Sequence, residues 1–359
     1  MNPVEPPTPF EPGTAGIAFF SRGRGSGHAV PDAALFQELR KLNPAIDVRW
    51  ISYGTGAATL RDLGYQVIDL QLPDTNPFLE TQMRATRVLS RLRPHLVIAH
   101  EEFSAAPAAK LFGLPVIFIT DYFAHPETIW MESLRYADEI VFIDESGVFE
   151  EPPFLKDKVR YVGPFVRDFT YTTNDRTRAR SELGLPPGAV IVLVLPGNWF
   201  NEERAPAFDL VIPAFHSLTN RDKLLIWFAG QDYHALQVRA ATYPRVMVKD
   251  VDWQIDRWMV ACDVAITKST RKTSLELASL GVPSVSLSYG LNFVDDVRVS
   301  RIATNTHLKV KDIDSGKLAQ HLARILATQT PGALPLASKT GLSAGAQRLA
   351  EHVARIRPA

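Results

Sequence analysis

Short runs of apolar residues recur along the chain, separated by longer segments whose apolar residues follow helical spacing. Apolar runs without polar alternation are typical of strands buried on both faces, as in a parallel sheet covered by helices. In the first half of the chain, this pattern predicts strands at residues 17–20, 48–52, 67–70, 96–99, 116–120 and 140–143. It predicts helices at residues 29–42, 57–63, 78–93 and 105–111.

The alternation lapses over residues 161–187, a polar stretch with Pro and Gly at both ends, and then resumes. It predicts strands at residues 190–195, 223–228, 246–248, 264–267 and 284–288, and an amphipathic helix at 344–356. We therefore expect two Rossmann-like, doubly wound α/β domains facing across a cleft, with ligands at the carboxyl ends of the strands. The expected divisions are a flexible tail (1–15), an N-terminal domain (16–166), a linker (167–187), a C-terminal domain (188–340) and a C-terminal helix (341–359).

Composition narrows the classes of function. The chain has 359 residues, with 39 Lys and Arg against 39 Asp and Glu, so its formal net charge is zero. This balance argues against a nucleic-acid-binding protein, which usually carries a basic excess. The single cysteine, Cys262, excludes an intramolecular disulfide and a cysteine zinc cluster. The Pro-rich N-terminus lacks a secretory pattern and no apolar run reaches membrane-spanning length, so we expect a cytoplasmic protein.

The most informative stretch of the second half follows the apolar run at 264–267. The chain turns through Lys268, Ser269 and Thr270 into a predicted helix. The free N–H groups and the positive dipole end at a helix N-terminus form an anion site. Arg271 and Lys272 add full positive charge to it.

Glu276, in the same predicted helix, has two interpretations. Thr273 and Glu276 have the spacing of a capping box, in which Glu276 would accept from the N–H of Thr273. Alternatively, its carboxylate would hold the two hydroxyls of a ribose beside a bound diphosphate. The residues of this stretch alone leave both interpretations open.

A glycine-rich loop, SRGRGSGH, follows the first predicted strand and ends at His28. Gly23, Gly25 and Gly27 allow a sharp turn and a close approach of the backbone to a ligand. A dinucleotide fingerprint fits poorly, since no acidic residue ends the second strand. The helix dipole disfavours protonation of His28, which is then neutral and available as a general base. The alternative is a histidine that caps its own helix.

Three segments together resemble one family. GRGSGH at 23–28, YVGPFVR at 161–167 and DVAITKSTRKTSLELASLGVPSVSL at 263–287 resemble motifs of GT-B glycosyltransferases. The nearest resemblance is to the family 28 type, which contains the peptidoglycan lipid-linked N-acetylglucosaminyltransferase and plant galactolipid synthases. The motifs occur in the same order and span essentially the whole chain.

The resemblance implies a nucleotide-sugar donor, typically uridine-linked, bound by the C-terminal domain. Glu276 would hold the ribose, and the backbone near Val251 would bind the base. Asn292 and Asp295 would bind sugar hydroxyls or belong to a polar loop, and Asp296 stands where relatives have an amide. The expected donor-binding residues are Gly197, Asn198, Val251, Lys268, Ser269, Thr270, Arg271, Lys272, Thr273, Glu276, Asn292 and Asp295.

The implied reaction is an inverting hexosyl or N-acetylhexosaminyl transfer to a hydroxyl of a lipid-linked or small-molecule acceptor. His28 would remove the acceptor proton, and Asp121, which follows a strand, would assist it or be a solvated loop residue. We expect the acceptor in the N-terminal domain, at Gly25, Gly27, His100, Glu101 and Glu102. A nucleotide-sugar hydrolase, a 2-epimerase and a non-catalytic nucleotide-sugar-binding protein remain as alternatives.

Two further features carry expectations. Asp250-x-Asp252 and Asp312-x-Asp314 mimic the manganese motif of a different glycosyltransferase fold, and we expect neither a required metal nor a cofactor. The basic side chains of the helix at 78–93 either dock on an anionic membrane, as a peripheral contact, or form a solvated face. These side chains are Arg84, Arg87, Arg91 and Arg93.

Overall fold

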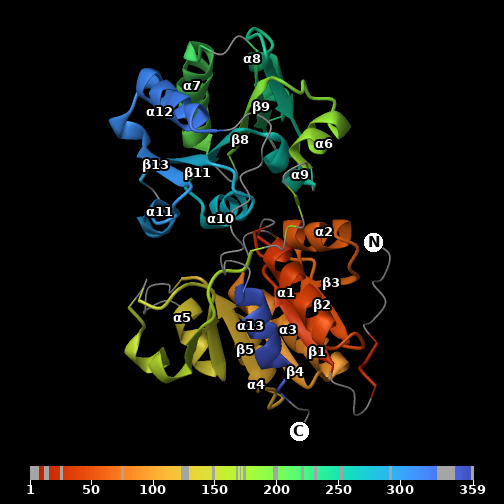
Figure 1. Ribbon diagram of the computed structural model, residues 1–359. Coiled ribbons are helices and arrows are strands. Elements are labelled where there is room, and N and C mark those ends of the chain that lie inside the picture. The colour runs from red at the N-terminus through yellow and green to blue at the C-terminus, as the bar shows by residue number, and fades with distance from the viewer. Residues whose placement is uncertain are drawn as a thin grey trace. The chain divides into compact units, whose positions relative to one another are not determined.

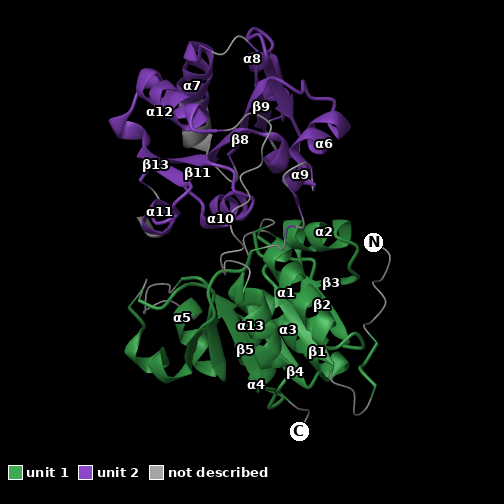
Figure 2. Cartoon of the chain, in the orientation of Figure 1, with its two compact units in different colours: residues 1–168, 341–359 green, residues 169–340 purple. Residues whose placement is uncertain are grey.

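The computed structural model contains two compact units (Figures 1 and 2). The first comprises residues 1–168 and 341–359, and the second comprises residues 169–340. The structure describes residues 8–11, 16–24, 27–73, 77–122, 129–147, 150–166, 169, 171–172, 175–196, 201–219, 222–229, 233–250, 252, 254–290, 293–329 and 344–356.

The first unit is built on a seven-stranded parallel sheet in the order β3-β2-β1-β4-β5-β6-β7. Its strands are β1 (Ile17–Ser21), β2 (Val48–Ser52), β3 (Val67–Asp69), β4 (Leu96–His100), β5 (Val116–Thr120), β6 (Glu139–Phe142) and β7 (Val159–Tyr161). Its helices are α1 (Ala29–Leu42), α2 (Gly54–Asp62), α3 (Phe78–Leu92), α4 (Ala105–Lys110), α5 (Ile129–Ser133) and α13 (Ala344–Val353). The strand order reverses at β1, which is where such sheets bind ligands beyond their carboxyl ends.

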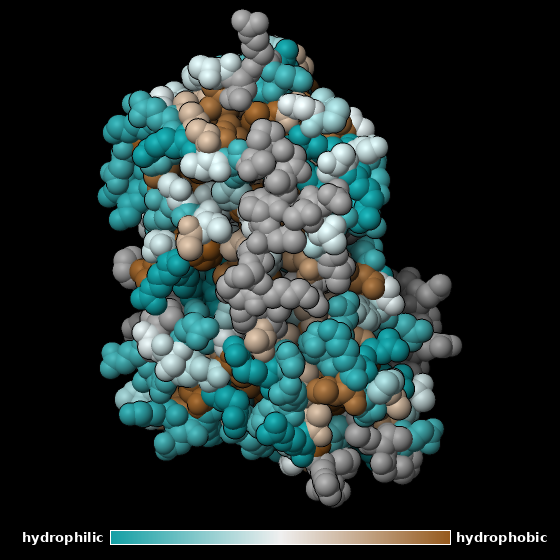
Figure 3. Space-filling view, in the orientation of Figure 1, coloured by the Kyte–Doolittle hydropathy of each residue, from teal (hydrophilic) through white to brown (hydrophobic). Residues whose placement is uncertain are grey.

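Apolar side chains cover both faces of this sheet, as the unbroken apolar runs predict. Because side chains alternate along a strand, Phe19 and Phe20 of β1 enter different cores. Phe20 packs in the core that contains Ala85 of α3, and Phe19 packs in the core that contains Leu35 of α1 and Leu349 of α13. On the face of the molecule seen in Figure 3, hydrophobic residues are scattered among hydrophilic ones.

The last helix, α13, packs on the first unit although it follows the second unit in sequence. Arg348 donates from Nε to the carbonyl oxygen of Val162 at 2.7 Å, and His352 Nε2 lies 2.5 Å from Glu139. A Cβ at Gly345 would lie 2.4 Å from the carbonyl oxygen of Pro164, so only glycine allows this close approach. The amphipathic pattern at 344–356 therefore reflects burial against the first unit.

The second unit is built on a six-stranded parallel sheet in the order β10-β9-β8-β11-β12-β13. Its strands are β8 (Val190–Leu195), β9 (Lys223–Phe228), β10 (Val246–Lys249), β11 (Val264–Lys268), β12 (Ser284–Ser288) and β13 (Asn305–Lys309). Its helices are α6 (Asp175–Glu182), α7 (Asn201–Ser217), α8 (Tyr233–Ala240), α9 (Ile255–Ala261), α10 (Arg271–Ser279), α11 (Phe293–Ser300) and α12 (Ser315–Ala327). The prediction of two parallel, doubly wound α/β sheets is confirmed, while β7 and β13 were not predicted.

Helix α6 lies inside the stretch that the sequence suggests is a linker, and two buried arginines anchor it to the second unit. Arg180 donates to Asp263 at 2.8 Å and to the carbonyl oxygen of Ala261 at 2.9 Å. Arg176 donates to the carbonyl oxygen of Val260 at 3.2 Å and pairs with Asp263 at 3.4 Å. The side chains that hold α6 in place, Arg176 and Arg180, are charged although they are buried. The sequence pattern therefore resembles an exposed linker and does not predict this helix.

We predict that Asp263→Ala lowers the free energy of unfolding by about 3–5 kcal/mol, since it removes the carboxylate that both buried guanidinium groups share. Arg178→Ala is the matched control on the same helix, because its side chain is 64% exposed. Denaturant titration of both variants measures the difference. Equal small losses would mean that the buried pairs contribute no more than surface ones.

Candidate active site

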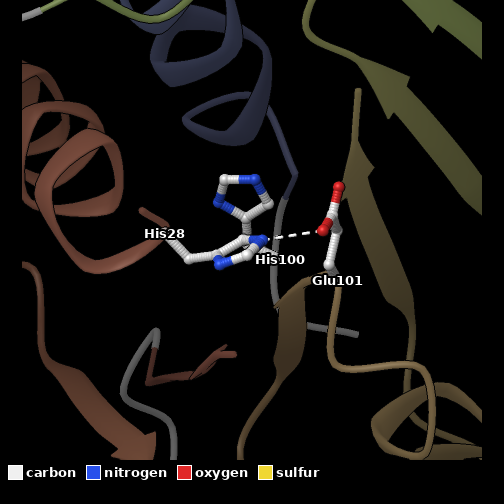
Figure 4. Close-up of side chains that lie close together, drawn as sticks. All are labelled: His28, His100 and Glu101. Carbon is white, nitrogen blue, oxygen red and sulfur yellow. Dashed lines mark hydrogen bonds and ion pairs between the residues drawn. The ribbon is translucent and has the colours of Figure 1, made fainter. Parts of the chain in front are cut away.

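His28 lies at the carboxyl edge of the first sheet, immediately before α1. His28 occupies the N-cap position of that helix, but its side chain makes no capping hydrogen bond. Instead, Nε2 lies 2.7 Å from Oε2 of Glu101, the residue that follows β4 (Figure 4). The glycine-rich loop thus brings the imidazole to a carboxylate from a neighbouring strand.

Glu101 is held in place from several sides. Oε2 also accepts from Nη1 of Arg22 at 3.3 Å, and Oε1 accepts from the hydroxyl of Thr120 at 3.3 Å. Glu101 has φ of 51°, a left-handed conformation that costs a non-glycine residue about 1–3 kcal/mol. Its side chain is only 5% exposed. Strain of this kind persists where surrounding contacts fix a side chain, and here they fix a carboxylate between a cation and an imidazole.

A second histidine–carboxylate pair lies directly beside the first. Nδ1 of His100, the last residue of β4, is 2.5 Å from Oδ1 of Asp32 in the first turn of α1. Both side chains are almost completely buried. The ring of His100 meets the ring of His28 edge to face, with centroids 4.7 Å apart (Figure 4).

Other polar groups are buried at the same edge. Burial raises the pKa of Glu102, which accepts a hydrogen bond from the hydroxyl of Ser104 at 2.7 Å. Among the described residues, the hydroxyls of Ser21 and Ser52 and Nε of Arg22 are buried without a hydrogen-bond partner. Buried polar atoms usually have partners, so their convergence at the ends of β1 and β2 favours a site for a polar ligand or water.

Some residues predicted to act with His28 lie in other positions than the sequence suggests. Asp121 follows β5, half-buried, and its backbone N–H lies 3.5 Å from Oε1 of Glu101. The carboxylate against His28 is therefore Glu101, which the sequence suggests only as an acceptor ligand. A catalytic role for Asp121 stays a prediction, as do acceptor roles for the nearly buried His100, Glu101 and Glu102. Gly27 is exposed just before His28, and Gly25 lies outside the described residues.

His28, His100 and Glu101 also place one potential metal-ligand atom each within 4.8 Å of one another. The contacts of this group fit a hydrogen-bonded network better than a metal site. Glu101 already accepts from the guanidinium of Arg22, a cation that would repel a metal ion, and its other oxygen accepts from the hydroxyl of Thr120. We therefore assign these side chains to the network and assign no metal site to them.

In the second unit, β11 leads through Ser269 and Thr270 into α10. Thr270 is the N-cap, so the helix begins at Arg271 and Thr273 already lies inside its first turn. A capping box with Thr273 at the N-cap is therefore wrong. Glu276 lies half-buried in the second turn, and Ser269 is buried just before the helix.

Asp296, in the first turn of α11, is turned into the second unit. Its Oδ2 accepts from the hydroxyl of Ser288 at 2.5 Å, and its Oδ1 lies 3.2 Å from Nε2 of His307. Burial acts to raise the pKa of Asp296, but hydrogen bonds from Ser288, Ser269 and His307 outweigh burial and lower that pKa below its ordinary value. Asp296 thus joins the ends of β11 and β12 to β13 and α11.

The remaining predicted donor residues are only partly described. Asp295 pairs with Arg298 at 3.5 Å. Of the acid pairs that resemble a manganese motif, Asp252 accepts from Nε1 of Trp258 at 2.7 Å, and Asp314 caps α12 by accepting from the backbone N–H of Lys317. Gly197, Asn198, Val251 and Asn292 lie outside the described residues.

Comparison with known proteins identifies distant relatives, while no protein-family model matches the chain. The UDP-N-acetylglucosamine--N-acetylmuramyl-(pentapeptide) pyrophosphoryl-undecaprenol N-acetylglucosamine transferase of Bacillus licheniformis is 23% identical over 290 residues, which cover 74% of this chain and 76% of the relative. The transferase 1 of the same description from Bacillus cereus is 22% identical, over 92% of this chain and 96% of the relative.

Solved structures of GT-B proteins match the fold. MurG of Acinetobacter baumannii aligns with a TM-score of 0.58 and 16% identity, covering 95% of this chain and 99% of that one. The UDP-GlcNAc 2-epimerase of Methanocaldococcus jannaschii aligns with a TM-score of 0.65 and 12% identity, covering 94% and 99%. In the described part of the chain, no helix is both long and apolar enough to cross a membrane. The chain therefore has the GT-B fold and is a distant sequence relative of the MurG-type transferases.

The lowered pKa of Asp296 has a consequence for stability. A carboxylate whose folded pKa lies below its unfolded value stabilises the fold above the unfolded value, and this contribution is lost as pH falls through the folded value. We predict that Asp296→Asn lowers the free energy of unfolding at pH 7 by about 1.5–3 kcal/mol, the range for hydrogen bonds to a charged group. Denaturant titrations at pH 7 and below pH 4 test this. A deficit that does not shrink at low pH would contradict it.

Proposed function

We propose that the protein is an inverting, metal-independent glycosyltransferase that moves a sugar from a uridine diphosphate donor to an acceptor hydroxyl. The observation that carries this proposal is the 2.7 Å contact between Nε2 of His28 and Glu101 at the carboxyl edge of the first sheet. An imidazole paired with a carboxylate is a common general base, and a base is what an acceptor hydroxyl needs. The distant likeness to N-acetylglucosaminyl transferases supports the same reaction class.

The contact with Glu101 supports a base role for one particular nitrogen of His28. Because a carboxylate accepts hydrogen bonds, the neutral ring carries its proton on Nε2, which donates to Glu101. Nδ1 is then the atom that takes the proton from the acceptor hydroxyl as its oxygen attacks the anomeric carbon. The positive charge that develops on the ring is stabilised by Glu101, while Arg22 holds that carboxylate in position.

The donor would bind the second unit at the N-terminus of α10. The leaving diphosphate gains negative charge as the bond to the sugar breaks, and the dipole of α10 stabilises that charge together with Lys268, Arg271 and Lys272. Glu276, one turn further along the helix, would hold the ribose hydroxyls. We infer this assignment from the helix start at Arg271 and from the resemblance of the segment 263–287 to donor-binding segments of the family.

A surface of the first unit supports an acceptor at a membrane. Leu79 and Met83 of α3 are 69% and 58% exposed, and Arg87 and Arg91 of the same helix are also exposed. Arg84 is instead held by Glu80 at 2.6 Å. Apolar side chains beside cations suit a peripheral contact with anionic lipid. The relatives named above act on an undecaprenol-linked substrate, which is consistent with such a contact.

The second candidate function is that of a hydrolase or 2-epimerase, supported by the likeness to solved 2-epimerase structures. Product analysis with a panel of nucleotide sugars, with and without lipid-linked and small-molecule acceptors, separates the candidates. A transferase releases nucleoside diphosphate in proportion to a new glycoside. Free sugar or a 2-epimer formed without acceptor would favour the second candidate, and binding without turnover would favour a non-catalytic protein.

We predict that Glu276→Ala weakens the binding of uridine diphosphate by about 1–3 kcal/mol, the loss of a charge-assisted hydrogen bond to ribose. Calorimetry on the folded variant measures this change. Glu182→Ala is the control, since Glu182 is a half-exposed glutamate elsewhere in the second unit. Equal affinities for the variant, the control and the wild type would remove Glu276 from the donor site.

We predict that His28→Asn reduces kcat about 10²–10⁴-fold, because the amide cannot act as a base. Affinity for uridine diphosphate should stay within about twofold, since donor binding is assigned to the second unit. His95→Asn is the control. This half-buried histidine lies just before the first residue of β4, at the other end of the strand from His100, and contacts the carbonyl oxygen of Gly16 at 2.6 Å. If His28→Asn turns over near the wild-type rate, His28 is not the base, and Asp121 is the first other candidate.

A further inference from the structure

Four side chains from two elements pair crosswise at the carboxyl edge of the first sheet. His28 and Asp32 lie at the start of α1, and His100 and Glu101 lie at the end of β4. The histidine of each element meets the carboxylate of the other, at 2.7 Å for His28 and Glu101 and at 2.5 Å for His100 and Asp32. The proposed reaction uses only the first of these pairs.

The burial of Asp32 calls for an explanation. Its side chain is completely buried on the inner face of α1, where the other buried positions are mostly apolar. Taking a carboxylate out of water costs several kcal/mol unless partners compensate. Within the described part of the chain, the hydrogen-bond partner of this side chain is His100, and the N-terminal end of α1 adds a favourable dipole. An apolar residue would fill this position at a lower free-energy cost, so we infer that the negative charge of Asp32 has a functional role.

The geometry connects this charge to His28. Because Asp32 accepts from Nδ1 of His100, it fixes the tautomer and the plane of that ring. The fixed ring then meets the ring of His28 edge to face, at 77° between planes. His28 is therefore restrained by His100 on one side and by Glu101 on another (Figure 4).

We propose that Asp32 and His100 are a positioning pair that restrains the ring of His28 and, through the negative charge of Asp32, increases its affinity for a proton. The catalytic consequence rests on the proposed function, whereas the effect on proton affinity does not. The other titratable and charged groups at this edge are Arg22 after β1, Tyr53 after β2, Glu101 and Glu102 after β4, and Asp121 and Tyr122 after β5.

The test is a titration of His28 followed by NMR of its imidazole protons, with the resonances assigned by their loss in His28→Gln. In Asp32→Asn, the midpoint of the His28 titration should fall by about one pH unit, the size expected for loss of a charge within roughly 10 Å at an effective dielectric constant of 20–40. Asp47→Asn makes the same chemical change before β2, at the opposite edge of the sheet, and should leave the midpoint unchanged. An unshifted midpoint in folded Asp32→Asn overturns the proposal.

A second variant keeps the proposal testable if Asp32→Asn does not fold. His100→Gln retains the carboxylate of Asp32, so the midpoint of His28 should stay at or above that of the wild type, and a lower midpoint overturns the proposal. Where turnover is measurable, the acid limb of kcat/KM should move to lower pH in Asp32→Asn with little change in KM. A wild type that titrates as expected but transfers no sugar would refute the proposed function and leave the positioning pair standing.

Discussion

The hydrogen bond between His28 and Glu101 is the interaction on which the rest of the first unit's site depends. It explains why a non-glycine residue keeps a left-handed backbone after β4, because that conformation is part of how Glu101 is presented to the imidazole. It explains the position of Arg22, which neutralises a carboxylate that is only 5% exposed. In the proposed reaction, Nδ1 of His28 takes the acceptor proton because Nε2 donates to Glu101. Asp32 and His100 then act on the same ring from within the fold.

The two units share one architecture but differ in the chemistry of their carboxyl edges. The edge of the first sheet gathers buried acids and imidazoles, which suit proton transfer. In the second unit, Lys268 ends β11 and Arg271 opens α10, so the same position carries positive charge and a helix N-terminus, which suit a diphosphate. In each sheet, these groups collect beside the interior strand at which the strand order reverses, β1 or β8.

The sequence predicted most of the fold because the central strands of both sheets, such as β1, β4, β8 and β11, are largely apolar runs, whereas the polar edge strands β7 and β13 gave no such signal. It missed what depends on contacts between distant elements. The sequence does not distinguish Glu101 from its neighbours His100 and Glu102, because neither its left-handed backbone nor its contact with His28 can be read from the sequence. Asp32 looks like an ordinary acid in the first turn of a helix. Arg176 and Arg180 made α6 look like a solvated linker although both are buried.

In the proposed reaction, His28, held by Glu101, removes a proton from an acceptor hydroxyl in a single inverting displacement. The most direct measurement follows the anomeric proton and carbon by NMR while the protein consumes an α-linked uridine diphosphate sugar in the presence of acceptor. Inverting transfer should give one new glycosidic signal of β configuration that grows as uridine diphosphate is released. A product of α configuration, or a free sugar or 2-epimer formed in place of a glycoside, would contradict it.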